Sequence, residues 1–258
     1  MKKYKKLEIK DVYEEVNSFQ QLSLVNDLIF GLRSLYSGDK SRNAIFVRPF
    51  DRDELSAQNL TGNNFKIKSN FHGYGGKAYK CLFFNEKYYL IWIDQITNSL
   101  WLQVFVKNKS ESKDLNFLLE DSIPRQLTAP LSGNFDASFV IFKELKLFGL
   151  YEQDDKDYLF SINLDNDINQ LIILREFEGF ACSLSCNEDQ TFLSWIEWKQ
   201  DNMSWEKNDL FFAEIDLNGK LLKTIKFKNR DINLKKSVSF FQPYWISKNI
   251  LICSEDSS

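Results

Sequence analysis

The sequence predicts an all-β protein, and three observations carry this prediction. The 258 residues include 23 Phe but only 10 Gly and 4 Pro. Apolar residues fall in short runs of about four to eight, bounded by Asn, Asp, Gly or Lys, as in β-strands. Helical periodicity is nearly absent, except that residues 11–19 favour a turn or two of helix. We therefore expect an N-terminal tail or short helix at 1–17 and one β domain at 18–258.

The expected strands arrive in groups of four. The first group comprises 19–25, 27–37, 43–50 and 57–62. The second comprises 76–85, 87–96, 98–107 and 124–130. The third comprises 136–144, 145–153, 157–165 and 168–176, and the fourth 179–187, 190–199, 208–219 and 220–228. Two further strands, the start of a fifth group, are expected within 237–258.

A repeated four-stranded unit predicts a β-propeller. The segments Asn59-Leu60-Thr61 and Gln126-Leu127-Thr128 close the first two groups at comparable points, so a unit of about 40 to 65 residues repeats. One such sheet cannot bury both of its faces alone and must stack against its neighbours. The predicted fold is a partial β-propeller of four-stranded antiparallel blades, about four and a half in number. A β-sandwich with long strands is the alternative.

Composition limits the partners and the compartment. The 33 basic and 36 acidic residues give a net charge of −3, which provides no broad positive field for nucleic acid. The basic start is not followed by the apolar core of a secretory signal, and no run approaches the ~18 apolar residues of a membrane span. We expect a soluble cytoplasmic protein that binds neither nucleic acid nor membrane.

The cysteines favour buried thiols over a disulfide framework or a metal site. There are four, Cys81, Cys182, Cys186 and Cys253, and their spacing matches neither a zinc ribbon nor a redox C-x-x-C pair. The acidic runs at 151–158 and 163–169 lack the turn Gly and terminal Glu of a calcium loop, so we expect solvated hairpin tips. No metal and no cofactor is predicted.

Three of the six tryptophans, Trp195, Trp198 and Trp205, lie within eleven positions. Trp195 and Trp198 are three apart and therefore fall on opposite faces of a strand, where each can pack against a different neighbouring sheet. Trp205 is expected to cap a long loop between strands. Packing is the favoured interpretation for all three, and stacking against a ligand is the alternative.

Residues 192–221, which carry these tryptophans, resemble a propeller segment of the prolyl oligopeptidase family of serine peptidases, in its acylaminoacyl-peptidase and dipeptidyl-aminopeptidase-like branch. The family's Asn-Met-Pro-Trp turn reads here Asn202-Met203-Ser204-Trp205. Residues 66–80 resemble its His-Glu-Tyr-Gly-Gly-Gly element, and residues 237–258 resemble its Gln-Pro-x-Trp strand. The matching residues of these two segments are His72, Tyr74, Gly75, Gly76, Gln242, Pro243 and Trp245. Gly73 and Lys77 depart from the family pattern.

The resemblance implies a propeller of seven blades followed by an α/β-hydrolase domain with a Ser-Asp-His triad. Nothing in this chain fits the Gly-x-Ser-x-Gly elbow of that domain, and His72 is the sole histidine. We therefore assign no catalytic residue and expect no α/β-hydrolase domain and no peptidase activity from the chain alone. With about four and a half blades, it is expected to be truncated and to expose strand edges and an apolar sheet face.

Three functions follow as hypotheses. The first is a non-catalytic propeller portion, ancestrally a substrate-gating cap over a peptide-hydrolysing site. The second is a standalone propeller that binds a peptide or protein partner. The third is one half of a split peptidase whose hydrolase domain is a separate chain.

His72 and Tyr74 are the candidate residues for contact with a substrate in the propeller channel. The competing interpretation of His72 is a structural histidine held at a tight Gly turn. Gly75 and Gly76 do not form a phosphate loop, because a strand rather than a helix N-terminus follows them.

Overall fold

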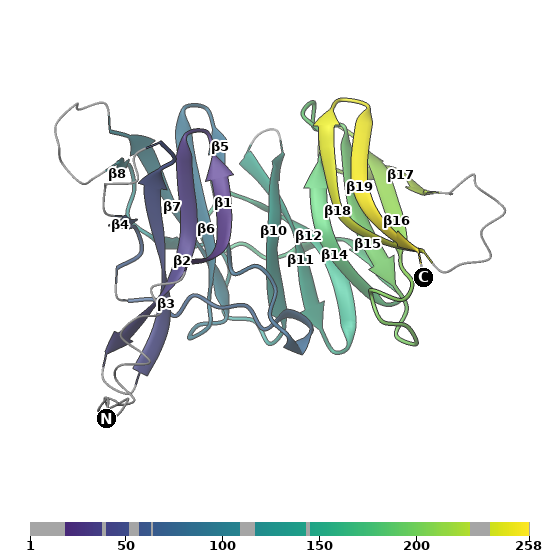
Figure 1. The fold of residues 1–258 in the computed structure, drawn as a ribbon, viewed down its shortest axis with the longest axis horizontal. Helices are drawn as coiled ribbons and strands as arrows, with labels where there is room; N and C mark the ends of the chain where they lie inside the picture. Colours follow the sequence, from purple (N-terminus) through teal and green to yellow (C-terminus); the bar gives the residue numbers. More distant parts are fainter. Residues whose placement is uncertain are drawn as a thin grey trace, which may run out of the picture.

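The computed structural model describes residues 19–37, 40–51, 57–62, 64–108, 117–142, 145–227 and 238–257. The predicted tail or helix at 1–17 lies outside these residues. The described part consists of antiparallel sheets and one 3-10 turn, and Figure 1 shows the sheets following one another across the molecule in chain order. No helix in the described part is long and apolar enough to cross a bilayer.

Four sheets are built by antiparallel pairing of successive strands, as the sequence predicts, apart from the fourth strand of the second sheet. The first sheet contains β1 (Phe19–Val25), β2 (Leu28–Ser37), β3 (Lys40–Pro49) and β4 (Gln58–Asn59). The second contains β5 (Tyr79–Phe84), β6 (Lys87–Asp94), β7 (Ser99–Lys107) and β8 (Leu118–Glu120), with β9 (Arg125–Gln126) also paired to β7. The third contains β10 (Asn134–Phe142), β11 (Lys146–Gln153), β12 (Lys156–Asn163) and β13 (Ile172–Glu176).

The fourth sheet contains β14 (Phe180–Cys186), β15 (Phe192–Trp198), β16 (Asp209–Ile215) and β17 (Leu221–Lys226). Its last two strands are joined by the turn at Asp216 to Lys220, in which Gly219 adopts a φ of +80°. A fifth sheet holds two strands in the described part, β18 (Val238–Ser247) and β19 (Ile250–Ser257). The predicted partial propeller of about four and a half blades is therefore confirmed.

The second, third and fourth sheets each bury both of their faces against the preceding and following sheets. On β6, Tyr88, Leu90 and Trp92 belong to the core shared with the first sheet. The alternate residues of the same strand, among them Ile91 and Ile93, belong to the core shared with the third sheet. Because side chains alternate between the faces of a strand, an unbroken apolar run fills both interfaces at once. This arrangement is that of propeller blades and excludes the two-layer sandwich.

Trp195 and Trp198 repeat this division on β15. Trp195 is fully buried in the core between the third and fourth sheets, where it stacks on Phe211. Trp198 packs against the smaller core between the fourth and fifth sheets, beside Ile196 and Phe240. The odd spacing of the two tryptophans thus places them in different interfaces, as expected.

The first strands of the sheets contact one another and form the innermost layer. β10 contacts both β5 and β14, and β14 contacts β18. Later strands of each sheet lie progressively farther from this layer, because each pairs with the strand before it. Loops that enter a first strand, or join a second strand to a third, lie at the same end of the sheets, because successive strands run in opposite directions.

The fourth strand of the second sheet differs from the prediction. The sequence predicts it at 124–130, whereas β7 pairs with two short pieces, β8 opposite Phe105 to Lys107 and β9 opposite Trp101 and Leu102. β8 was missed because its apolar run is only "FLL" and is followed directly by acidic residues. β8 and β9 therefore pair with different parts of the same edge of β7.

The fifth sheet exposes one apolar face to solvent. Tyr244 and Ile252 pair across β18 and β19 and are 63% and 49% exposed. Ile250, two residues before Ile252 on the same strand, is 52% exposed, and Ile246 is 54% exposed. We call these four residues the fifth-sheet face. Their exposure agrees with the expected uncovered blade face.

Candidate ligand-binding cavity

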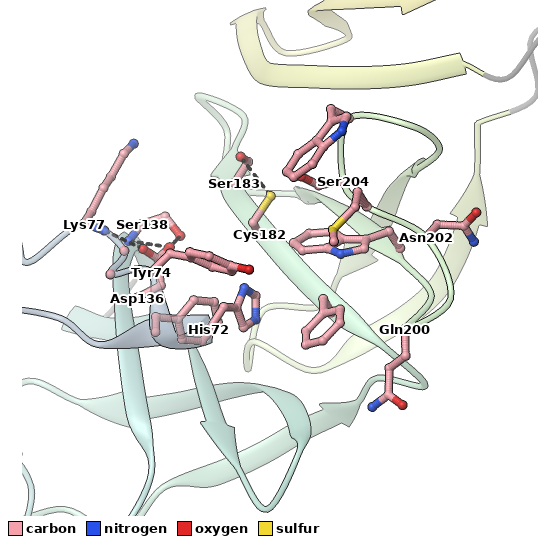
Figure 2. A pocket seen from close by; sticks show the side chains of 17 residues that line it. His72, Tyr74, Lys77, Asp136, Ser138, Cys182, Ser183, Gln200, Asn202 and Ser204 are labelled. Carbon is pink, nitrogen blue, oxygen red and sulfur yellow. Dashed lines mark hydrogen bonds between the residues drawn. The ribbon is translucent and has the colours of Figure 1, made fainter. Parts of the chain in front are cut away.

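A cavity of about 490 Å³ opens beside the innermost strands of the third and fourth sheets. Its floor includes Asp136 and Ser138 of β10 and Phe180, Cys182 and Ser183 of β14. One wall is the loop that enters β5, at residues 71–77, and the opposite wall is the end of β15 with the loop that follows, at residues 198–205. Figure 2 shows side chains from both walls around the cavity.

The loop before β5 is shaped by left-handed backbone conformations. His72, Gly73 and Gly75 have φ values of 52°, 72° and 88° within and after the 3-10 turn η1 (Phe71–Gly73). The buried Ser69 hydroxyl holds the loop closed, since it accepts the N–H groups of Phe71 and Gly76 and donates to the Phe135 carbonyl at 2.6 Å. The loop is thereby fixed to β10.

His72 is held at the cavity by a buried carboxylate. Its Nε2 lies 2.7 Å from Asp157 Oδ2, and the two side chains are 13% and 2% exposed. The same carboxylate oxygen accepts the Ala181 N–H at 2.7 Å. The His72 backbone N–H donates to Glu152 at the end of β11. His72 is therefore both a cavity residue and a structural residue, so the two interpretations open from the sequence are compatible.

Asp157 corrects one prediction. The run 151–158 was expected to be a solvated hairpin tip, and its middle residues Asp154 and Asp155 are exposed in the turn between β11 and β12. Asp157, however, is 1% exposed. Its burial is offset by hydrogen bonds from His72 and Ala181, which lie on other parts of the chain. Nothing in the local pattern distinguishes Asp157 from its exposed neighbours.

Asp136 fixes the other end of the same loop. Its Oδ1 accepts the Lys77 N–H at 2.8 Å, and its Oδ2 accepts the N–H and hydroxyl of Ser138. A Cβ added to Gly76 would lie 2.4 Å from Asp136 Oδ1, so only glycine leaves room for the carboxylate. The requirement at Gly76 is therefore close approach and not an unusual φ value.

The opposite wall is a loop of mostly polar residues, and three of its apolar side chains line the cavity and are partly exposed to solvent. Trp198 is half-buried, whereas Met203 and Trp205 are 49% and 62% exposed. The buried Asn208 amide fixes the loop, because it donates to the Ser204 carbonyl at 2.7 Å and to the Phe240 carbonyl of β18 at 3.0 Å. Asn208 was not a candidate residue, because an isolated Asn before a strand carries no signal of such a role.

An aromatic cluster joins the two walls across the floor. The His72 ring meets the Phe180 and Trp198 rings edge to face, at centroid distances of 4.9 and 5.5 Å. Phe71 lies tilted against His72 at 3.9 Å. Edge-to-face contact is a favoured geometry for aromatic pairs, so the cluster holds its rings in place before any ligand arrives.

The cavity thiol is poorly suited to act as a nucleophile. Burial raises the pKa of Cys182 to about 11 from an ordinary value of 9.0, so the reactive thiolate is scarce at neutral pH. In the described part of the chain, no serine or cysteine side chain hydrogen bonds to His72. The cavity therefore has the features of a binding site and lacks those of a hydrolytic triad.

Among the residues that the structure describes, the group that could hold a metal ion is His72, Glu152 and Asp157, whose ligand atoms lie within 4.8 Å of one another. Each of the two carboxylates already accepts a backbone N–H, from His72 and Ala181 respectively. A histidine N–H supplies a further hydrogen bond to Asp157. Through these hydrogen bonds the three side chains hold the loop before β5 against the third and fourth sheets.

The remaining candidates lie away from the cavity. Gln242, Pro243 and Trp245 are on β18, where Gln242 adopts a φ of 52° at a bulge and Trp245 donates to the Ser194 hydroxyl at 3.0 Å. Trp245 also lines a second, apolar cavity of about 400 Å³ between the fourth and fifth sheets. Trp195 is in the core. The structure thus unites His72, Tyr74, Gly75, Gly76, Trp198, Asn202, Met203 and Trp205 at one site.

The fold and the cavity define an incomplete β-propeller with a ligand-sized cavity at its innermost strands. Similar solved structures are a puromycin-hydrolysing peptidase of Mycobacterium tuberculosis, with a TM-score of 0.71 and 17% identity, and a puromycin hydrolase. The structure of the puromycin hydrolase has a TM-score of 0.75, and that of its mutant complexed with PGG has a TM-score of 0.77. Both are 15% identical to this chain. The matches cover 95–98% of this chain but only 35–38% of those chains.

These matches establish the fold as that of the propeller part of such peptidases. This chain spans little more than a third of their length. No model of a known protein family matches the sequence. No curated protein matches it either.

Proposed function

We propose that the chain is the propeller portion of a serine peptidase of the prolyl oligopeptidase family, and that it admits and holds short peptide substrates. One observation carries the proposal. Two of the three segments that resemble the family's propeller, around His72 and around Trp198 to Trp205, form opposite walls of one cavity. The fold shared with puromycin-hydrolysing peptidases supports it.

The cavity suits selection by size. Its floor is formed by the innermost strands and its walls by two loops that are hydrogen bonded to neighbouring sheets. A volume of about 490 Å³ lies within the ordinary range of sites for small ligands. A short flexible chain can insert into such a space, whereas a folded domain cannot. The gating role is therefore steric.

Calorimetric titration with capped peptides of two to four residues tests the proposal. We expect saturable binding by the short peptides and none by a stably folded protein that displays the same sequence in a surface helix. The variant Trp198→Leu should weaken binding, because Trp198 forms part of a wall. Absence of binding by every short peptide at millimolar concentration would rule out a substrate-holding role.

The chain is proposed to lack peptidase activity by itself. His72, its sole histidine, is hydrogen bonded to Asp157 and contacts no nucleophile by a hydrogen bond in the described residues. Purified protein should leave aminoacyl and acyl-peptide chromogenic substrates intact. Cleavage that is abolished by a serine-directed inhibitor would contradict this part of the proposal.

A hydrolase domain is the proposed partner, either continuous with this chain or separately encoded. The exposed fifth-sheet face supports a partner, because contiguous apolar surface on a protein commonly marks an interface. Co-expression with a hydrolase domain of the same genome should give a complex on size-exclusion chromatography, and lysines at Ile250 and Ile252 should disrupt it.

The proposed location is the cytoplasm, where the four cysteines would remain the free thiols that the structure shows.

A further inference from the structure

The inference concerns which peptide side chain the cavity receives, and it rests on the proposed function. The side chains around the space are dominated by rings. Phe71, His72 and Tyr74 come from one wall, Phe180 from the floor, and Trp198 and Trp205 from the opposite wall. Figure 2 draws the side chains that line the cavity, with His72 and Tyr74 labelled among them.

The tryptophans of the far wall retain unused polar groups. In the described part of the structure, Trp198 and Trp205 make no hydrogen bond through their indole N–H, in contrast to Trp195 and Trp245, which donate to Glu197 and Ser194. A Trp ring that is half-buried or exposed, with a free N–H, offers an apolar face and one donor to a ligand. Met203 beside them adds a flexible thioether that adapts to a ring.

The carboxylates in and beside the cavity already accept hydrogen bonds from the protein. Asp136 accepts hydrogen bonds from Lys77 and Ser138, which satisfy both of its oxygens. Asp157 is engaged by His72 and Ala181. Figure 2 shows the Lys77 side chain extending away from His72. The position where the resembled family has Glu is Gly73, which has no side chain. The cavity therefore offers no free carboxylate for an amine and no inward ammonium for a carboxylate.

The polar groups that remain are neutral. Ser183 on the floor and Ser204 on the loop after β15 line the cavity, whereas Figure 2 shows the Gln200 and Asn202 side chains extending away from the rings. Hydroxyl groups of this kind can hydrogen bond to peptide N–H and C=O groups. A ligand with an uncharged ring and a peptide backbone matches both parts of the site.

We propose that this cavity is a subsite for an aromatic side chain of a peptide, with the ring lying against the cluster of His72, Phe180 and Trp198 and next to Trp205. The existing edge-to-face cluster provides the template for a further ring. An aliphatic side chain fills less of the space and gains no such contact. We therefore expect the cavity to bind a peptide with Phe or Tyr more tightly than one with Leu.

The test is calorimetric titration of the full chain with acetylated and amidated Ala-Phe-Ala, Ala-Leu-Ala and Ala-Ala-Ala. The Phe peptide should bind about three- to tenfold more tightly than the Leu peptide, because one aromatic contact contributes this much beyond the area buried. Trp198→Leu and Trp205→Ala should each reduce the preference. Because Trp205 is 62% exposed, its removal leaves the core intact and keeps the test valid if Trp198→Leu unfolds the protein.

Trp245→Leu is the matched control, since it removes the same side chain from the second apolar cavity. The preference for Phe should persist in this variant. Loss of the preference in Trp245→Leu, with retention in the Trp205 variant, would overturn the assignment to this cavity. Equal binding of all three peptides would overturn the aromatic subsite while leaving the proposed function intact. Binding of none would defeat the proposed function itself.

Discussion

The His72 ring and the Asp157 carboxylate, 85 positions apart in the chain, are hydrogen bonded at 2.7 Å. This bond ties the loop before the second sheet to the third sheet, and the Ala181 N–H extends it to the fourth. One buried carboxylate thus links three successive blades at the edge of the cavity. Its removal leaves a backbone N–H and an imidazole without their partner.

We expect Asp157→Ala to lower the free energy of unfolding by about 1–3 kcal/mol, the cost of leaving a buried donor unsatisfied. Asp155→Asn is the control, because Asp155 is exposed in the adjacent turn and Asn tolerates its φ of 60°, so stability should change by less than about 0.5 kcal/mol. Urea unfolding followed by circular dichroism measures both. Similar values for the two variants would show that the bond contributes no stability.

Gly76→Ala should disturb the loop before β5 more than Gly73→Asn. The added methyl group at Gly76 meets Asp136 Oδ1 at 2.4 Å, whereas nothing lies within 4 Å of a Cβ at Gly73. Asn tolerates the positive φ of Gly73. We expect a loss of about 1–3 kcal/mol for Gly76→Ala, in the range of overpacking effects, measured by urea unfolding. A harmless Gly76→Ala would mean that Asp136 moves freely.

Alkaline pH should destabilise the protein. Burial raises the pKa of Cys182 to about 11 and that of Cys186 to about 12, from an ordinary value of 9.0. Between pH 9 and these values the unfolded chain loses thiol protons that the native protein keeps, so the free energy of unfolding falls as pH rises. The thiol contribution is fully present below pH 9. Thermal unfolding between pH 8 and 11 measures this effect.

The double variant Cys182→Ser and Cys186→Ser is the control for that titration, and it should show a shallower decline above pH 9. An independent measurement is alkylation by iodoacetamide at pH 8. The thiolate fraction of Cys182 should be about 100-fold smaller than that of a thiol with the ordinary pKa, because the two differ by two units. Rapid labelling of Cys182 in the native state would contradict its raised pKa.

The fifth-sheet face should promote self-association of the isolated chain. Ile250→Lys with Ile252→Lys places two charges on this face and should lower the apparent mass measured by light scattering at high concentration. Ile96→Lys with Ile123→Lys is the matched control, because these isoleucines are 70% and 80% exposed but lie in the loop regions of the second sheet. Equal behaviour of the two double variants would exclude the face as the cause.

Much of the fold could be predicted because strands carry their signal locally. The runs around Tyr88 to Ile93 and around Trp195 are apolar on both faces, which only a sheet packed on two sides requires. The arrangement of these strands in groups of four then indicated the blades of a propeller. The split fourth strand of the second sheet was missed, because short edge strands are defined by their partner and not by their own periodicity.

The sequence by itself determined the strand pattern, the grouping into blades and the opposite packing of Trp195 and Trp198, because these follow from the alternation of side chains along a strand. Only the tertiary structure decided that the loops of His72 and Trp205 face each other, and that Asp157 is buried while Asp155 is not. These properties depend on how neighbouring sheets are placed, and contacts between residues distant in the chain leave no periodic signal in the sequence.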